Sequence, residues 1–335
     1  MDVLNLSETG LDILPDLSQQ TIKSLNLSWN NICVLYDNHL PIGIEELNLE
    51  GNSINSDGLL QDWPRSLHTI NLSRNNYYSL DEVFFWPASL RVLNLSRTNL
   101  GKLDCSRLPV SLEELDISHT FVQILATFPV SLKKFQAAYT EIKSLPFRCP
   151  DSLEEFIFTR SRQPMRRRML PSYWGASLKK IDLNSTGIKE IPGNLPETLE
   201  DANFSNNLIE EIPSVGILPR NLKFLHLGKN KIRIIPSWVL KNHQMKFTIQ
   251  DNSLTELPQS PNCLLSHFQW VGEHVTTSVR KIQKFWRIKR IFPRIRTWKR
   301  MKTLKSDLLA LAMSPERAGR FEDISSEWKY VYKGP

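Results

Sequence analysis

The first 258 residues of the chain repeat one short pattern twelve times, and this pattern limits the possible folds more than any other feature. An apolar residue at position 1 is followed by apolar residues at positions 4 and 6 and by Asn, Thr or Ser at position 9, as in residues 67–75, 112–120 and 222–230. The copies are 20 to 25 residues apart, and position 4 is occupied by Leu4, Leu25, Leu47, Ile70, Leu93, Leu115, Phe135, Phe156, Ile181, Ala202, Leu225 and Phe247. Internal periods of this length indicate a solenoid of stacked units.

Each copy is predicted to form a short strand that is stable only within a stack. The alternation at positions 4 and 6 has the period of two that is typical of a half-buried strand. A single copy cannot bury its own leucines, so neighbouring copies must share one apolar column. We interpret the polar residue at position 9 as scaffold, because a short polar side chain can bond backbone groups where the chain turns inward.

The segments between the strands are predicted to be extended. Many copies are preceded by Pro-x-Ser-Leu, as in residues 64–67 and 109–112. Proline fixes φ and removes a hydrogen-bond donor, which favours polyproline-like or short 3-10 segments over long helices. The predicted fold class is therefore a β-rich solenoid of horseshoe shape. It has short parallel strands on the concave face, an extended or 3-10 convex side and a C-terminal α-helical tail.

The repeated pattern resembles that of the leucine-rich repeat superfamily, and the resemblance covers residues 1–258. Recurrent Leu-Pro and Ile-Pro endings, such as residues 145–146, are similar to the effector-type repeats of some bacteria and to repeat proteins of large DNA viruses. The bacterial effector ligases carry a long C-terminal domain with a nucleophilic cysteine. Residues 259–335 are too short for that domain, and Cys263 is followed by two leucines rather than by the acidic residue of the ligase motif. We therefore reject a ligase, and the resemblance implies a binding surface without a catalytic pocket.

The sequence predicts no enzyme, cofactor or metal site. The seven histidines lie in separate repeats or in the tail, and no His-Glu-x-x-His, Cys-x-x-Cys, Gly-rich phosphate loop or nucleophile elbow occurs.

The chain enters its first repeat without a basic and apolar leader, and no apolar run approaches the roughly 20 residues that span a bilayer. The scattered cysteines (Cys33, Cys105, Cys149 and Cys263) favour free thiols in a reducing compartment. We expect an intracellular, cytoplasmic monomer, in the host cell if the chain is viral.

The positive charge of the chain is concentrated after the repeats. The net charge is +7, and twelve of the 42 Lys and Arg residues fall in residues 279–305, without an acidic residue. The predicted organisation is a solenoid over 1–258, a linker or cap over 259–278, a basic amphipathic helical segment over 279–312 and a partly disordered tail over 313–335. The candidate binding residues of the basic segment are Arg280, Lys281, Ile282, Gln283, Arg287, Lys289, Arg290, Arg294, Arg296, Lys299 and Arg300.

Three interpretations of this basic segment stay open. Ile282, Gln283 and Arg287 resemble the opening of an IQ motif, the calmodulin-binding helix, although Ile288 stands where that motif has glycine. Together with the Ser-Pro-Glu-Arg of residues 314–317, the segment is similar to the C-termini of uncharacterised giant DNA virus proteins. The first interpretation is a helix that caps the open end of the solenoid. The second is an amphipathic helix for calmodulin-like or other acidic partners, and the third is a site for the phosphates of nucleic acid or of an anionic membrane.

The concave face is the predicted surface for a protein partner. Position 5 is mostly Asn or Asp, and such a row of stacked side chains can bond along itself as readily as to a ligand. Position 8 varies more and carries Arg and aromatic residues, the types enriched at interface hot spots. We predict a partner-binding stripe, with a solvated edge as the alternative, formed by Trp29, Arg74, Arg97, His119, Tyr139 and Arg160. The Arg-rich residues 160–168, in the longest spacing between copies, form either a functional loop or a tolerated insertion.

The sequence thus supports two functional hypotheses. The first is a non-enzymatic scaffold that binds a protein on the concave face and uses the basic tail as a second contact. The second is binding of nucleic acid, an anionic membrane or a calmodulin-like partner through the tail, with the solenoid as a spacer.

Overall fold

The computed structural model describes residues 2–255, apart from residue 37 and residues 81–84, 167–168, 214–217 and 242–244. Contacts divide the chain into two units, Met1–Leu257 and Pro258–Pro335. The predicted linker, basic helical segment and C-terminal tail lie outside the described residues, so the fold below is that of the repeats.

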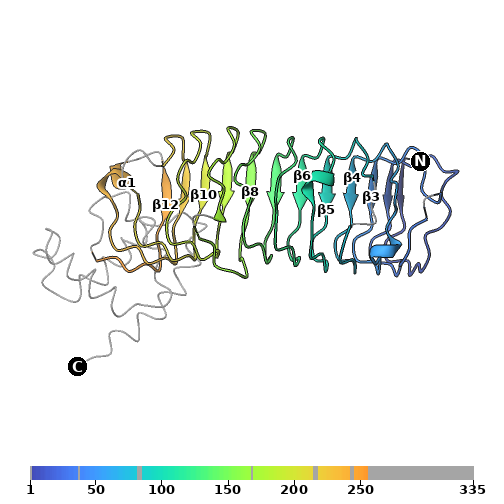
Figure 1. Cartoon of the computed structure of the whole chain (residues 1–335), viewed down its shortest axis with the longest axis horizontal. Helices are drawn as coiled ribbons and strands as arrows, with labels where there is room; N and C mark the ends of the chain where they lie inside the picture. The colour runs from blue at the N-terminus through green and yellow to red at the C-terminus, as the bar shows by residue number, and fades with distance from the viewer. Residues whose placement is uncertain are drawn as a thin grey trace, which may run out of the picture. The chain divides into compact units, whose positions relative to one another are not determined.

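The described repeats form one parallel sheet in which the strands follow sequence order (Figure 1). Every strand has three residues, and position 4 of the pattern is its central residue, with Leu4 opposite Leu25 and Phe135 opposite Phe156. The predicted strands and their register are therefore confirmed. The strands are β1 (Val3–Asn5), β2 (Ser24–Asn26), β3 (Glu46–Asn48), β4 (Thr69–Asn71), β5 (Val92–Asn94), β6 (Glu114–Asp116), β7 (Lys134–Gln136), β8 (Glu155–Ile157), β9 (Lys180–Asp182), β10 (Asp201–Asn203), β11 (Phe224–His226) and β12 (Lys246–Thr248).

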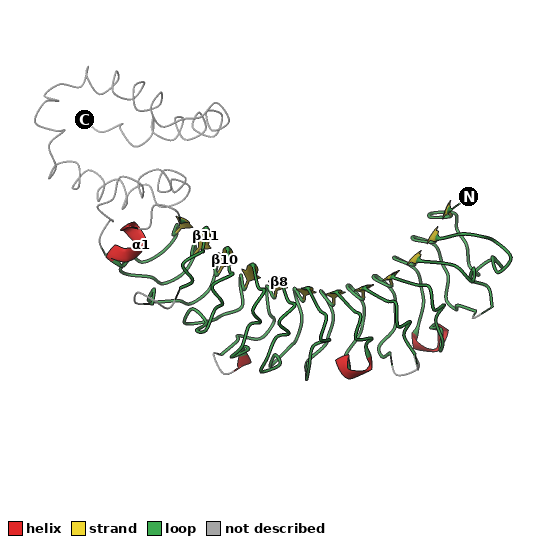
Figure 2. Cartoon of the chain, turned by 90° about the horizontal axis from the view of Figure 1, so that it is seen from above, coloured by secondary structure: helices red, strands yellow, loops and turns green. Residues whose placement is uncertain are grey.

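The strands lie on the inner side of a curved row of repeats (Figure 2). Hydrogen-bonded strands stay about 4.8 Å apart, whereas the segments behind them carry prolines and bulky side chains and spread further. The inner side is consequently the shorter one. The strand side chains that do not enter the core face this concave surface.

The core is a continuous column of side chains from positions 1, 4 and 6. Leu67, Ile70 and Leu72 of one repeat are fully buried, and the same positions are buried in most of the others. The middle of the column is aromatic, because β7 and β8 carry Phe135 and Phe156 where other repeats carry leucine. Burial of this kind contributes about 1.5–3 kcal/mol per large apolar side chain, and each repeat receives it only from its neighbours.

The convex side differs from the sequence prediction in two respects. Besides the expected 3-10 turns, η1 (Ser56–Gly58) and η2 (Cys105–Arg107), it contains a short α-helix, α1 (Ser237–Lys241). The Pro-x-Ser-Leu segments are turns rather than extended chain, since the backbone N–H of Leu67 donates to the carbonyl of Pro64 at 3.1 Å. The Ser66 hydroxyl completes the turn by donating to the Ile44 carbonyl of the preceding repeat at 2.6 Å.

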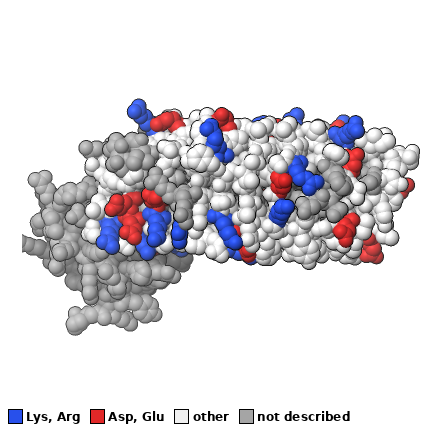
Figure 3. Space-filling model, in the orientation of Figure 1, with Lys and Arg blue, Asp and Glu red and all other residues white. Residues whose placement is uncertain are grey.

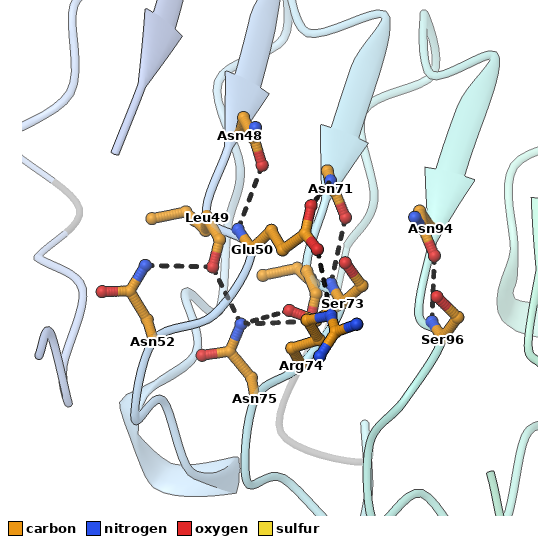
Figure 4. A network of polar contacts seen from close by, with 11 residues as sticks. Asn48, Leu49, Glu50, Asn52, Asn71, Ser73, Arg74, Asn75, Asn94 and Ser96 are labelled. Atoms are coloured by element: carbon orange, nitrogen blue, oxygen red, sulfur yellow. Dashed lines mark hydrogen bonds and ion pairs between the residues drawn. The ribbon is translucent and has the colours of Figure 1, made fainter. Parts of the chain in front are cut away.

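A ladder of asparagines at position 9 ties adjacent repeats together (Figure 4). The Asn75 Oδ1 accepts from the backbone N–H of Ile54 at 3.0 Å, and its Nδ2 donates to the carbonyls of Leu49 at 2.9 Å and Leu72 at 3.1 Å. Asn52 makes the equivalent bonds one repeat earlier. Each amide thus satisfies buried backbone groups of two repeats at once, which confirms the structural role predicted for position 9.

The ladder changes where position 9 is threonine. Thr98 and Thr120 donate to the carbonyl three residues earlier in their own repeat, at 2.9 and 2.7 Å. Here Tyr77, which is not part of the repeated pattern, joins the hydrogen-bond network. Its fully buried hydroxyl donates to the Leu72 carbonyl at 3.2 Å and is also hydrogen-bonded to Thr98. Burial raises the pKa of this hydroxyl, so Tyr77 stays neutral and acts as a scaffold residue.

Candidate functional site: the concave face and its edge

Position 8 has a left-handed backbone in every described repeat. Arg97, His119 and Tyr139 have φ of +58°, +59° and +57°, values that cost a non-glycine residue about 1–2 kcal/mol. The conformation is held by the backbone, because the position-8 N–H of every described repeat before the last donates to the position-7 carbonyl of the next repeat, as from Arg97 to Ser118 at 2.7 Å. Side chains at position 8 are therefore presented at the edge of the concave face from a rigid base.

Sequence reasoning missed this backbone feature. The signal was present, since Gly51, Asn206 and Asp251 also occupy position 8, and these residue types tolerate a positive φ. The arginine and aromatic residues of the column conceal it.

The position-5 side chains mostly close local turns. The Oδ1 atoms of Asn48, Asn71 and Asn94 accept from the backbone N–H two residues later, at 3.0, 3.1 and 3.0 Å (Figure 4). Bonds along the row also occur, such as that from Asn203 Nδ2 to Asp182 Oδ2 at 3.1 Å. Hydrogen bonds from one position-5 side chain to the next are thus less common than bonds to the local backbone, because the nearest backbone N–H is the closest donor for the side-chain oxygen.

The N-terminal part of the predicted stripe is built around a missing side chain. Gly51 has no side chain, and the Trp29 ring lies over it, so close that an added Cβ would meet the ring at 2.9 Å. The Arg74 guanidinium lies 5.4 Å from the centre of the Trp29 ring, within the range of a cation–π contact. Arg74 Nε also pairs with Glu50 at 3.1 Å (Figure 4). Trp29 and Arg74 therefore lie together although their repeats are not adjacent.

The C-terminal part of the stripe is a stack of three side chains. The His119 and Tyr139 rings are 4.5 Å apart with an angle of 20° between them. The Arg160 guanidinium lies 5.1 Å from the Tyr139 ring centre and donates to the Tyr139 hydroxyl. These contacts hold the half-buried His119 and Tyr139 rings and the exposed Arg160 in place, and all three side chains remain accessible to solvent.

Between the two parts lies an open hollow, which we call the arginine hollow, with a volume of about 370 Å³. Its lining includes Arg74, Arg97 and His119 from position 8, together with the position-10 residues Asn76, Asn99 and Phe121. The pKa of His119 is lowered, first by burial and then by Arg97, with smaller effects of Arg162 and Arg74 and an opposing effect of Asp116. His119 is therefore mostly neutral near pH 7. The geometry brings all six predicted stripe residues to one edge and joins them in these three groups.

A second hollow of about 650 Å³ lies further along the same edge. Arg160 and Lys229 are its two cations, and hydroxyl and amide side chains such as Ser185, Asn206 and Gln250 line the rest. Lys229 and Asn206 are not among the binding residues predicted from the sequence.

Positions 2 and 3 carry charges that alternate in sign from repeat to repeat, a second feature that the sequence analysis did not use. The position-2 residues Glu113, Lys133 and Glu154 belong to successive repeats, and Lys133 Nζ pairs with Glu113 at 2.8 Å. Further pairs join Lys179 to Glu154 at 2.7 Å and Lys223 to Glu200 at 2.8 Å. The face drawn in Figure 3 also shows acidic side chains beside basic ones. These rows neutralise themselves, so the excess positive charge of the edge comes from position 8.

Reversing one charge in this row should weaken the stack. Lys133→Glu would place three glutamates side by side, because Lys133 lies between Glu113 and Glu154 and holds the pKa of Glu113 below its ordinary value. We expect a Tm lower by about 2 °C in low salt and a smaller difference in high salt, as for exposed ion pairs. Thermal unfolding at two salt concentrations checks this. Arg65→Glu, a charge reversal at an exposed position outside the row, should have no such salt-dependent effect.

The Arg-rich insertion is only partly a free loop. Arg162 Nη1 pairs with Glu141 at 3.2 Å, and its guanidinium lies 5.0 Å from the Phe121 ring centre. Tyr173 hydrogen-bonds to Asp151 and lies under Arg148. Arg162 and Tyr173 therefore pack against the solenoid, while residues 167–168 lie outside the described residues.

The described residues offer little for catalysis. Burial raises the pKa of the Cys105 and Cys149 thiols to about 12, so neither is a nucleophile at neutral pH. Among the residues that the structure describes, no group of three or more His, Cys, Asp or Glu side chains could hold a metal ion. In the same part of the chain, no helix has the length and apolar character needed to cross a membrane.

Comparison with known proteins agrees with the repeat geometry. A family model described as Leucine Rich repeat matches residues 18–32, which include β2. The chain has the leucine-rich repeat fold. YopM from Yersinia enterocolitica is similar over 72% of this chain with 26% sequence identity and a TM-score of 0.58, and the match spans 49% of the YopM chain, about half its length.

Two further solved structures share the fold at lower identity. An internalin from Listeria monocytogenes matches 75% of this chain and 73% of its own, at 15% identity and a TM-score of 0.57. A chain of the LRIM1/APL1C complex matches 100% of this chain and 72% of its own, at 17% identity and a TM-score of 0.57. No curated protein matches the sequence. The repeats therefore place this chain among proteins with the leucine-rich repeat fold.

Proposed function

We propose that this protein is a non-enzymatic scaffold that binds another protein through the concave face of its repeats. The observation that carries the proposal is the stripe at position 8. Trp29, Arg74, Arg97, His119, Tyr139 and Arg160 lie along one edge on backbones held by inter-repeat hydrogen bonds. Because five of these side chains, all except Arg97, are already ordered by ring stacking or cation–π contacts, a partner would lose less entropy in fixing them.

The proposal predicts that Arg97→Ala combined with Tyr139→Ala weakens partner binding at least tenfold. Arg and Tyr at the centre of an interface are the residue types that most often contribute more than 1 kcal/mol each. The partner would first be identified by pull-down and crosslinking with the full chain, and its affinity then measured by calorimetry. Arg65→Ala with Tyr78→Ala removes the same residue types from exposed positions outside the stripe and should leave the affinity unchanged. Equal partner affinity of the two double variants would show that the stripe is not part of the binding interface.

A second candidate function rests on the tail. Twelve Lys and Arg residues without an acidic residue in 279–305 favour binding of nucleic acid, an anionic membrane or a calmodulin-like protein. Deleting residues 279–335 separates the two proposals. Retained protein partners support the concave face, whereas loss of all association, combined with binding by the full chain that falls steeply with salt, supports the tail.

We also propose that the protein works in a reducing, cytoplasmic compartment. The free Cys33, Cys105 and Cys149 of the described repeats support this.

A further inference from the structure

The arginine hollow is lined by cationic side chains and by no acidic side chain. The residues that line it are Arg, Asn, Thr, His and Phe, without a carboxylate. Arg97 stands at its centre, between Arg74 and His119 in the order of the repeats, and has no ion pair among the described residues. Cationic groups elsewhere on the repeats, such as Lys133 and Lys179, are paired with glutamate. The hollow therefore carries a net positive charge that no neighbouring carboxylate fully neutralises.

The donors of the hollow outnumber what one carboxylate can use. Each guanidinium carries five N–H groups in a planar fork, and the ion pair of Arg74 with Glu50 involves its Nε. The amides of Asn76 and Asn99 and the imidazole of His119 add further donors from the same wall. A phosphate group presents three terminal oxygens and a charge of about −1.5 to −2, and paired guanidiniums bind it through two hydrogen bonds each.

The surroundings favour one anionic group over a polyanion. Strand β6 carries Asp116, whose carboxylate acts on the pKa of His119 in the hollow and would repel a continuous chain of phosphates. The Phe121 ring at the rim, which also contacts the Arg162 guanidinium, is 39% exposed and offers an apolar surface of the kind a peptide covers. A protein segment with a single phosphorylated residue meets both conditions.

We propose that the arginine hollow is a subsite for the phosphate group of a phosphorylated side chain on the protein partner. The inference rests on the proposed function, because it names the chemistry of the partner that the stripe binds. Arg97 is the central phosphate contact, Arg74 and His119 flank it, and the Asn76 and Asn99 amides complete the ring of donors.

His119 gives a direct readout of an anion in the hollow. Its ring stacks on Tyr139, and it is flanked by Arg97, Arg74, Arg162 and Asp116. The cations disfavour the imidazolium, so an anion that neutralises them should raise the pKa of His119. By linkage, the anion should bind more tightly as the pH falls and His119 takes up its proton.

The first experiment uses sulfate, a tetrahedral dianion whose charge is constant near neutral pH, and the full chain. NMR titration of the His119 ring protons in sodium sulfate, against sodium chloride of equal ionic strength, should show a higher pKa in sulfate. Arg97→Gln should abolish that difference, whereas Arg65→Gln, an exposed arginine outside the hollow, should retain it. Identical His119 titrations of the unaltered protein in the two salts would overturn the proposal.

The second experiment identifies the source of the anion. Degenerate peptide pools that contain phosphoserine, aspartate or serine at one fixed position, and a single-stranded oligonucleotide, are tested for binding to the full chain. Retention of the phosphoserine pool at least tenfold above the other pools, abolished in Arg97→Gln and kept in Arg65→Gln, supports the subsite. Equal retention of the aspartate pool, or a preference for the oligonucleotide that is also lost in Arg97→Gln, contradicts it. If the protein partner still binds after phosphatase treatment, this inference fails while the proposed function survives.

Discussion

Replacing Asn75 by alanine is expected to lower the free energy of unfolding by about 2–4 kcal/mol, although the substitution removes no apolar contact of the core. The Asn75 amide accepts from the Ile54 N–H and donates to the carbonyls of Leu49 and Leu72. Alanine would leave these buried backbone groups without a partner, and each unsatisfied group costs about 1–3 kcal/mol. Part of that cost is recovered where water enters the site.

The adjacent residue provides a matched control. Asn76 is also an asparagine, but its side chain is exposed, so Asn76→Ala should change the free energy of unfolding by less than about 0.5 kcal/mol. Urea unfolding of the two variants gives the comparison, and hydrogen exchange locates it. The Ile54 amide should lose protection in Asn75→Ala, since its acceptor is gone. Similar urea midpoints for both variants would show that the ladder contributes little.

The sequence predicted those parts of the fold that depend on a period. Apolar residues at positions 1, 4 and 6 predicted the strand centres and the core, because each of these side chains is buried by the same positions of the neighbouring repeats. The repeat pattern could not predict the role of Tyr77. Its buried hydroxyl bonds to Thr98, which lies in the next repeat and replaces the asparagine found at position 9 of other repeats.

The candidate site was predictable in its residues and not in its geometry. The six stripe residues lie at one edge because position 8 recurs, which the spacing alone determines. The arginine hollow depends on Gly51, which lets Trp29 reach toward Arg74, and on Arg97, which has no ion pair among the described residues, whereas cations such as Lys133 are paired with glutamate. Such contacts join residues some 20 to 45 positions apart, and their side-chain directions follow from the left-handed backbone that the pattern concealed.

Replacing Phe156 by alanine is expected to lower the free energy of unfolding by about 3–5 kcal/mol, the largest effect of any substitution proposed. Phe156 is fully buried, and its ring centre lies 5.4 Å from that of Phe135 and 5.3 Å from that of Trp174. Truncation removes the buried ring and leaves a cavity between two repeats, and both terms add to the loss. Phe156→Leu, which restores the residue found in other repeats, should lose about 1–1.5 kcal/mol.

The position of Phe156 in the array gives this prediction a second consequence. The stability of a solenoid is a sum over neighbouring interfaces, so a cavity at β8 weakens its contacts with both β7 and β9. Urea unfolding of Phe156→Ala should broaden, and hydrogen exchange should increase in the repeats around β8 before it does near β3. Phe147→Ala, at a residue that is 73% exposed, should leave both measurements unchanged within about 0.5 kcal/mol. A loss below about 1 kcal/mol for Phe156→Ala would mean that the aromatic column collapses to fill the cavity, and that the repeats are held together mainly by the asparagine ladder and the strand hydrogen bonds.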